Sequence, residues 1–461
     1  MFWGIPVLVF LVLAFDGNTH WDENNYLAKA AYAPLGFEEA WIHSWGEFYV
    51  GRLFHILLLK TYFILAGVGL IQLLGAEALM AVSVLGAGFL LSRSARLLGA
   101  EDKSAHFVFL CYVFSPLGLY LGYKSLAETT ALLCVSAAVF LFLVGDIKRS
   151  GQRIFLASAC LFAASFSRAE SLLGFLAVAF PAVIIGRKDR GRAVGVLASV
   201  LGWWILFSLG FGLLTGLWSY RFFLFRSEAF AHNIAQDLTD YPPNFVSIVL
   251  FGGGMWLLAL FGIVPARTKL SRIALAGLAL SLFPLLIIPE HLEIRYLHPL
   301  LLPFALSAGL GLARISQELG KKMSSVASCG VALAILAGVV FSNQFTRPLQ
   351  EVGVNGMELI GLVQEVSADR PDPLLFTSSV PNTYSFLRAA FPNLRLAGTP
   401  MPGMLMSLKI SSPDDLLRLP PPWIYVSTRG TGPVPFGEHF RSQEVARRGR
   451  YVAYLLEPLG E

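Results

Sequence analysis

The chain has 461 residues, of which 55% are hydrophobic and 14% charged, with a mean hydropathy of +0.64 and a formal net charge of +5. A soluble domain carries about 25% charged residues, so this composition excludes an ordinary cytosolic, disordered or collagen-like protein. Apolar surface in this amount needs lipid as its solvent, which predicts a polytopic membrane protein. The four cysteines lie apart in apolar stretches, so we expect neither a disulfide framework nor a zinc site.

Eleven apolar segments approach the length of about 20 residues that a spanning helix needs. In chain order they lie near residues 2–16, 77–94, 104–121, 126–145, 153–167, 169–186, 193–216, 245–264, 271–288, 299–316 and 325–341. The first lacks the basic flank and the cleavage site of a signal peptide, so we expect it to remain as a helix. The pattern predicts an all-α transmembrane domain over residues 1–344.

The segment 53–74 is apolar but carries Lys60, Gln72 and several glycines. If it lies at the interface and does not cross, the short loops on one side hold 16 Lys and Arg residues and the loops on the other side hold 8. This asymmetry fits the positive-inside rule, whereas a crossing at 53–74 would reverse most of the basic loops. We therefore predict juxtamembrane helices in the first outer loop, a cytoplasmic N-terminus and an extracytoplasmic C-terminal part, in a multi-pass protein of the inner or plasma membrane. Topology accounts for most of the positive charge, and we expect no nucleic-acid partner.

From about residue 345 the composition changes, because prolines become frequent and short β-type runs alternate with helix-compatible segments. The predicted strands are residues 374–377, 394–396, 423–426 and 451–456. The predicted helices are residues 382–390, 413–418 and 438–447. This alternation predicts a small α/β soluble domain over residues 345–461.

Charged residues close to a membrane are costly and usually mark function. On the predicted topology, four outer loops carry such residues: Asp22 and Glu23; Lys124 and Glu128; Arg168 and Glu170; and His291, Glu293 and Arg295 with Tyr296. Carboxylates can accept a proton from an acceptor group, and basic side chains can hold a phosphate. Structural alternatives stay open, since an Asp can cap a helix, Arg168 and Glu170 can form a simple ion pair, and an interfacial lysine can snorkel.

The residues 289–299 read Pro-Glu-His-Leu-Glu-Ile-Arg-Tyr-Leu-His-Pro, and this stretch resembles the His-Lys-Glu-x-Arg-Phe signature of dolichyl-phosphate-mannose-dependent mannosyltransferases. It equally resembles the looser Arg-Tyr-(x)-Pro element of the lipid A aminoarabinose transferases and protein O-mannosyltransferases. Leu292 replaces the lysine and Tyr296 the phenylalanine of the first signature, which weakens the case for mannose. Other segments also resemble parts of one superfamily, the GT-C integral membrane glycosyltransferases. They are the acidic pair after a short first helix, the stretch from Gly51-Arg52, Ser115-Pro116 and residues 167–170. The resemblance covers about residues 1–340.

The resemblance implies an inverting enzyme that moves a hexose, mannose or pentose from a polyprenyl-phosphate donor in the membrane to a lipid, glycan or protein acceptor. In this interpretation Asp22 is the general base and Glu23 orients the acceptor or shares that role. The donor phosphate is held by Lys124, Arg168, Arg295 and His291, and the orienting residues are Glu128, Glu170, Glu293 and Tyr296. The acidic loop has no Asp-x-Asp pair, so we expect no metal cofactor; if a divalent ion binds, Asp22 and Glu23 are its predicted ligands.

Two other classes of protein stay open. A transporter or flippase of a lipid-linked sugar would use the same charges for binding without chemistry, and inverted repeats or paired broken helices, which would favour it, are not evident in the sequence. A scaffold protein could act through its outer domain, but the charges gather in the membrane loops and not in that domain.

Overall fold

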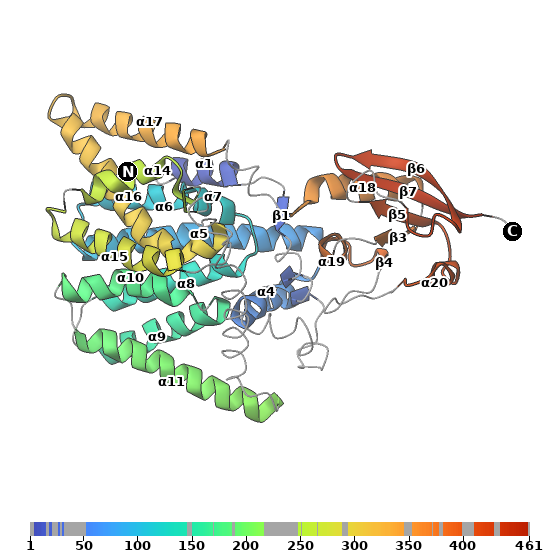
Figure 1. The fold of residues 1–461 in the computed structure, drawn as a ribbon, viewed down its shortest axis with the longest axis horizontal. Coiled ribbons are helices and arrows are strands. Elements are labelled where there is room, and N and C mark those ends of the chain that lie inside the picture. The colour runs from blue at the N-terminus through green and yellow to red at the C-terminus, as the bar shows by residue number, and fades with distance from the viewer. Residues whose placement is uncertain are drawn as a thin grey trace.

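The computed structural model describes residues 4–14, 18–20, 26–27, 30–31, 52–144, 150–168, 170–186, 190–215, 248–249, 251–264, 266–287, 294–344, 353–370, 372–377, 381–398, 410–427 and 434–459. In these parts of the chain, long helices form a bundle, and a smaller domain with a five-stranded sheet lies at one end of it (Figure 1).

The helices of the bundle are α1 (Gly4–Ala14), α4 (Leu53–Ala66), α5 (Leu70–Leu97), α6 (Asp102–Val113), α7 (Pro116–Leu121), α8 (Ala127–Leu143), α9 (Ser150–Ser167), α10 (Ser171–Ile184), α11 (Arg190–Thr215), α14 (Met255–Ile263), α15 (Lys269–Ile287), the 3₁₀ helix η3 (Ile294–Leu300), α16 (Leu301–Gly320) and α17 (Ser325–Gln344). Three helical stretches of the described residues are long and apolar enough to cross a membrane: Leu70–Leu97, Arg190–Gly210 and Arg295–Gly320. Five shorter apolar helices accompany them. The helical class is confirmed, and the number of crossings stays a prediction.

The segment 53–74 does not form one unit. Residues 53–66 form α4, and residues 70–74 already belong to α5, which begins earlier than the predicted span near 77–94. The break falls at Gly67, whose φ of +84° lies in the left-handed region that glycine adopts without strain.

The predicted span near 104–121 is broken into α6 and α7 at Ser115. The Ser115 hydroxyl oxygen accepts a hydrogen bond from the Gly118 N–H at 2.9 Å, and Pro116 opens α7 at a position where its missing N–H costs nothing. The capped break therefore replaces a continuous helix.

Helix α16 packs closely on its neighbours through small residues. Gly311 of α16 and Gly262 of α14 lie against each other's helix backbones, and Gly309 lies against Val108 of α6, so a Cβ at any of these glycines would collide with the neighbouring helix. Close backbone approach of this kind supplies the van der Waals contact that holds helices together in lipid. It fixes the middle of α16, the helix that follows η3.

The C-terminal domain is a mixed sheet of strand order β4-β3-β5-β7-β6, with helices beside it. Its elements are β2 (Gly353–Asn355), α18 (Gly356–Asp369), β3 (Leu374–Thr377), α19 (Pro381–Ala390), β4 (Arg395–Gly398), α20 (Pro413–Leu417), β5 (Trp423–Ser427), β6 (Phe440–Arg448) and β7 (Tyr451–Pro458). Strand β3 runs parallel to β4 and β5, and β7 runs antiparallel to β5 and β6. The small α/β fold of this region is thus confirmed.

The prediction of a helix over 438–447 is wrong, because residues 440–447 belong to strand β6. Gly449, with a φ of +53°, starts a tight turn that folds β6 back onto β7, and the ladder runs from Arg448 opposite Tyr451 to Phe440 opposite Pro458. Pairing with β7 overrides the helix-compatible composition of the segment.

The two parts of the chain are joined by a short strand pair. Strand β1 (Asn18–His20) runs antiparallel to β2, with Asn18 opposite Asn355 and His20 opposite Gly353. Helix α19 also contacts α5. The boundary near residue 345 stays a prediction, but the strand pair ties residues 18–20 to the C-terminal part of the chain.

Candidate functional site

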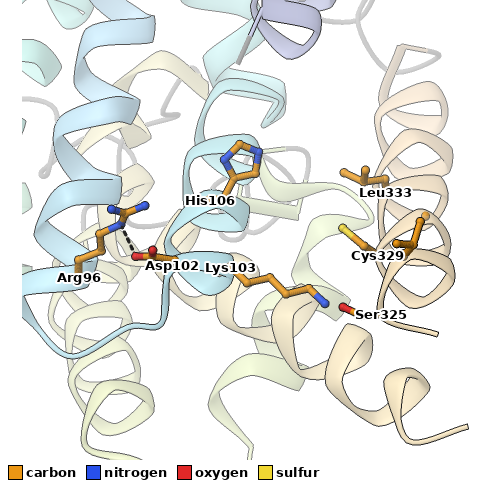
Figure 2. Close-up of a pocket in the computed structure, with 9 residues that line it drawn as sticks. Arg96, Asp102, Lys103, His106, Ser325, Cys329 and Leu333 are labelled. Atoms are coloured by element: carbon orange, nitrogen blue, oxygen red, sulfur yellow. Dashed lines mark ion pairs between the residues drawn. The ribbon is translucent and has the colours of Figure 1, made fainter. Parts of the chain in front are cut away.

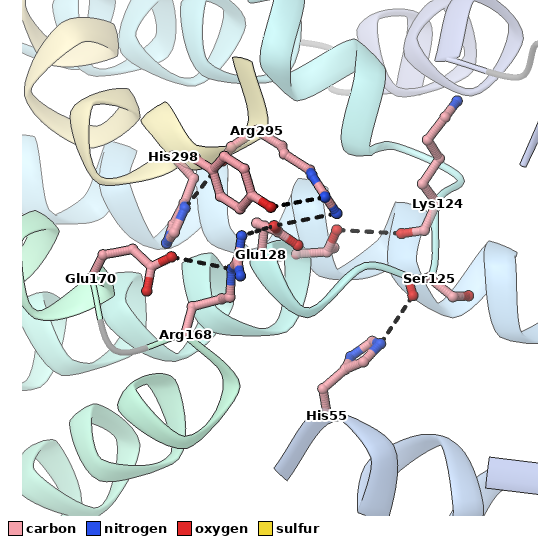
Figure 3. A network of polar contacts seen from close by, with 10 residues as sticks. His55, Lys124, Ser125, Glu128, Arg168, Glu170, Arg295 and His298 are labelled. Carbon is pink, nitrogen blue, oxygen red and sulfur yellow. Dashed lines mark hydrogen bonds and ion pairs between the residues drawn. The ribbon is translucent and has the colours of Figure 1, made fainter. Parts of the chain in front are cut away.

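Three chain segments that are far apart in sequence meet at the end of the bundle nearest the C-terminal domain (Figures 1 and 3). Glu128 lies in the first turn of α8, Arg168 directly follows α9, and Arg295 lies in η3. Their side chains are 1%, 1% and 2% exposed, respectively. The apolar helices thus bring three charged groups together out of contact with solvent.

Glu128 is the centre of this cluster. Arg168 Nη2 donates a hydrogen bond to Glu128 Oε1 at 2.5 Å, and Arg295 Nη1 lies 3.9 Å from the same oxygen. The other carboxylate oxygen, Oε2, is buried and has no hydrogen-bond partner among the described residues. A buried carboxylate is tolerated only when cations and donors compensate its lost hydration. Arg168 is therefore the close partner of Glu128, and Arg295 is the looser one.

Tyr296 brings the two guanidinium groups together. The Cζ atoms of Arg168 and Arg295 lie 4.6 Å and 4.8 Å from the centroid of its ring, and Arg295 Nη2 donates a hydrogen bond to its hydroxyl at 3.1 Å. Attraction of cations to the ring face offsets part of the repulsion between two like charges.

Glu170 and Lys124 complete the part of the site that the sequence predicted. Glu170 Oε1 lies 3.4 Å from Arg168 Nε, and its side chain is 27% exposed. Lys124 is buried, and its Nζ lies 4.8 Å from the centroid of the Tyr120 ring. Figure 3 shows the amine of Lys124 directed away from Glu128. The amine is therefore not a close partner of the carboxylate.

His298 is a buried member of the site that we did not single out from the sequence. Its Nδ1 lies 3.1 Å from the Arg295 carbonyl oxygen, so this nitrogen donates, and its Nε2 lies 2.7 Å from the Ser171 hydroxyl, which donates to it. The imidazole therefore links η3 to α10 and fixes the backbone that carries Arg295. In the sequence, only its position three residues after Arg295, in the same motif, indicates that His298 belongs to the site.

His55, in α4, was also missed. Its Nε2 lies 3.0 Å from the Ser125 carbonyl oxygen and its Nδ1 lies 2.8 Å from the Thr130 hydroxyl. Burial lowers the pKa of His55 to about 4, so the ring is neutral near pH 7, with Nε2 donating and Nδ1 accepting. His55 thus ties α4 to the start of α8, next to Glu128.

Arg52, which precedes α4, is 2% exposed and interacts electrostatically with Glu128. It is a third arginine near this carboxylate, and in the sequence it stands out only through the family resemblance. Its burial at the start of α4 has no local signature in the sequence.

Four predicted site residues, Asp22, Glu23, His291 and Glu293, lie outside the described residues. Strand β1 ends at His20, two residues before Asp22. Within the described ranges, His, Cys, Asp and Glu side chains form no group of three that could hold a metal ion. The roles of the four residues stay predictions.

The described residues thus form a bundle of apolar helices with buried arginines at one end, joined there to a small α/β domain. The chain is similar to the crystal structure of ArnT from Cupriavidus metallidurans bound to undecaprenyl phosphate, with a TM-score of 0.62 and 14% sequence identity over 98% of this chain and 97% of that chain. It is also similar to ArnT from the same organism in the apo state, with a TM-score of 0.57 and 16% identity over 98% and 97% of the two chains. At this identity the likeness shows a shared fold, and it confirms the fold that the predicted resemblance implies. Comparisons with protein-family models and with curated proteins give no match.

Proposed function

We propose that this protein is a glycosyltransferase that moves a sugar from a polyprenyl-phosphate donor to an acceptor hydroxyl at the outer face of the membrane. The observation that carries the proposal is the pair of buried guanidinium groups, Arg168 and Arg295, that converge on Glu128 and on the face of Tyr296. The fold supports it, since a solved protein with this fold is bound to undecaprenyl phosphate.

Arg295 is the residue best suited to hold the donor phosphate. Its guanidinium is 3.9 Å from Glu128, beyond hydrogen-bond distance, so a phosphate can approach without breaking a hydrogen bond to that carboxylate. A guanidinium stays charged at any working pH and presents two parallel donors to phosphate oxygens. Lys124 adds a second cation, while Arg168, through its close bond to Glu128, keeps the cluster in place. His291 is proposed as a further phosphate ligand.

In the proposed reaction the oxygen of an acceptor hydroxyl attacks the anomeric carbon, and the bond from that carbon to the phosphate oxygen breaks. Asp22 accepts the hydroxyl proton, and Glu23 orients the acceptor. Negative charge grows on the departing polyprenyl phosphate, and preorganised cations in a water-poor site stabilise that charge. Attack opposite to the leaving group inverts the configuration at the anomeric carbon.

Glu170, Glu293 and Tyr296 are proposed to orient the sugar or the arginines. The strand pair β1–β2 supports a placement of Asp22 near this end of the bundle, because β1 ends only two residues before it. No metal enters this scheme, and transfer is expected to proceed in excess EDTA.

Titration of the purified protein with undecaprenyl phosphate tests the phosphate role. A charge-assisted hydrogen bond contributes about 1.5–3 kcal/mol, so Arg295→Ala is expected to weaken binding by roughly tenfold to a hundredfold. Arg295→Lys keeps the charge but loses the two-donor geometry, and is expected to lose most of its turnover with smaller loss of affinity. Arg314→Ala, at the other end of α16, is the matched control and should bind as the wild type does. Unchanged affinity in Arg295→Ala would refute the phosphate role.

A further inference from the structure

A second cavity lies at the opposite end of the bundle from Glu128. Helix α5 begins at the end of the bundle where the candidate site lies and ends at Leu97, at the opposite end. Helix α6 begins there and runs back toward the site. Helix α16 starts at the site and ends at this opposite end, so α17, which follows it, begins there too (Figure 1). The cavity has a volume of about 690 Å³ and lies between α5, α6 and α17 (Figure 2). Ligand pockets usually measure about 300–1,000 Å³, so it is large enough for a lipid headgroup.

One wall of this cavity is basic. It carries Arg96 of α5 and Lys103 and His106 of α6. Asp102 also lines the cavity, but it is 3.2 Å from Arg96 Nε and so is matched by that cation. Lys103 has no acidic ion-pair partner among the described residues, and Figure 2 shows its side chain extended toward Ser325 across the cavity. The wall therefore keeps a net positive charge next to α17, an apolar helix with exposed side chains.

The other wall is apolar and belongs to α17. Val326 and Leu333 line it and are 84% and 37% exposed. Farther along the same helix Phe341 is 67% exposed, and α17 lies at the edge of the bundle (Figure 1). An apolar surface thus leads directly out of the basic cavity along the outside of the protein.

We propose that this cavity binds the phosphate headgroup of an anionic membrane phospholipid, with the phosphate at Lys103 and Arg96 and the acyl chains along α17. A basic wall matches a phosphate, and the continuous apolar wall selects a lipid over a soluble phosphate. This site is separate from the site around Glu128 and does not depend on the proposed transfer reaction.

Two variants on opposite walls test the site. Lys103→Gln removes the charge of a lysine that lines the cavity. Its control is Lys322→Gln, which changes an exposed lysine that follows α16 and does not line the cavity. Gly330→Leu fills the cavity from α17, and Gly338→Leu is its control on the same helix; a Cβ at either glycine meets no atom within 4 Å, so both variants should fold.

The measurement is native mass spectrometry of the full chain in detergent with phosphatidylglycerol or phosphatidylcholine added. The expected result is that the wild type and both controls retain phosphatidylglycerol in preference to phosphatidylcholine. Lys103→Gln should weaken that retention roughly fivefold, which is the effect of one basic residue near an anionic lipid, and Gly330→Leu should abolish it.

Equal retention of the two lipids, or equal loss in Gly330→Leu and Gly338→Leu, would overturn the proposal. Displacement of the lipid by millimolar inorganic phosphate would also overturn it, because the cavity would then be a site for soluble phosphate.

Discussion

Replacement of Arg168 by glutamine is expected to destabilise the fold strongly. The side chain of Arg168 and that of its partner Glu128 are each 1% exposed, and they share the hydrogen bond at 2.5 Å. Glutamine keeps much of the length and polarity of the side chain but removes the charge. The buried carboxylate then loses its hydrogen-bonded cation and keeps Arg295 at 3.9 Å and the electrostatic interaction with Arg52.

The expected loss follows from that arrangement. Removal of one partner of a buried ion pair costs about 3–5 kcal/mol, because the remaining charge stays desolvated. The lost contact with the Tyr296 ring at 4.6 Å is included in this range. When Glu128→Gln is added to Arg168→Gln, the unpaired charge disappears, so the double variant should be at least about 1.5 kcal/mol more stable than the sum of the two single losses.

Equilibrium unfolding of the purified variants in mixed micelles measures these free energies. Arg93→Gln serves as the control, because Arg93 is exposed and its Cζ lies 5.0 Å from the centroid of the Phe89 ring. Loss of this contact should lower the free energy of unfolding by less than about 1 kcal/mol. A loss for Arg168→Gln no larger than that of the control, or strict additivity in the double variant, would refute the view that Glu128 and Arg168 form the buried anchor of the site.

Three further predictions concern the base, the buried histidine and the topology. Asp22→Asn should reduce sugar transfer by about 10²–10⁴-fold with donor affinity nearly unchanged, as single-turnover and binding assays can measure; near-normal turnover would move the base to another residue. Burial lowers the pKa of His55 from 6.5 to about 4, so the stability of the folded state is full above about pH 6.5 and falls as the pH drops toward 4. Between about pH 7.5 and 5 this loss amounts to roughly 2 kcal/mol, and His55→Gln should lack it; equal pH dependence of the two proteins in thermal unfolding would contradict the assignment. A membrane-impermeant thiol reagent added from outside should label Gln72→Cys and not Lys103→Cys, and outside labelling of the latter would reverse the predicted orientation.

The helices and the arginine cluster could be predicted from the sequence for a simple physical reason. Long apolar runs have no stable alternative to helices in lipid, and a charge at the end of such a run must lie at the membrane boundary. The predicted topology places Glu128, Arg168 and Arg295 at one face of the membrane, and the structure brings these three side chains close together.

Other features depend on contacts that no local pattern encodes. His55 and His298 lie within apolar segments, and their roles appear only when the partners Ser125 and Ser171 are brought beside them. Strand β1 has three residues and pairs with a segment near the other end of the chain, so it has neither the length nor the alternation that identifies a strand. The helix predicted over 438–447 failed for a related reason, because a hairpin partner decides the conformation of a short polar segment.

The central claim is that the protein transfers a sugar and does not merely bind or move its lipid carrier. The direct measurement is the amount of polyprenyl phosphate formed when the purified protein is incubated with a polyprenyl-phosphate-linked sugar and a lipid and glycan extract, followed by mass spectrometry. The account predicts that the wild type releases polyprenyl phosphate together with a glycosylated acceptor, and that Asp22→Asn binds the donor but leaves it intact. A donor that stays intact with the wild type, while its passage across a vesicle bilayer accelerates, would contradict the account and identify a flippase.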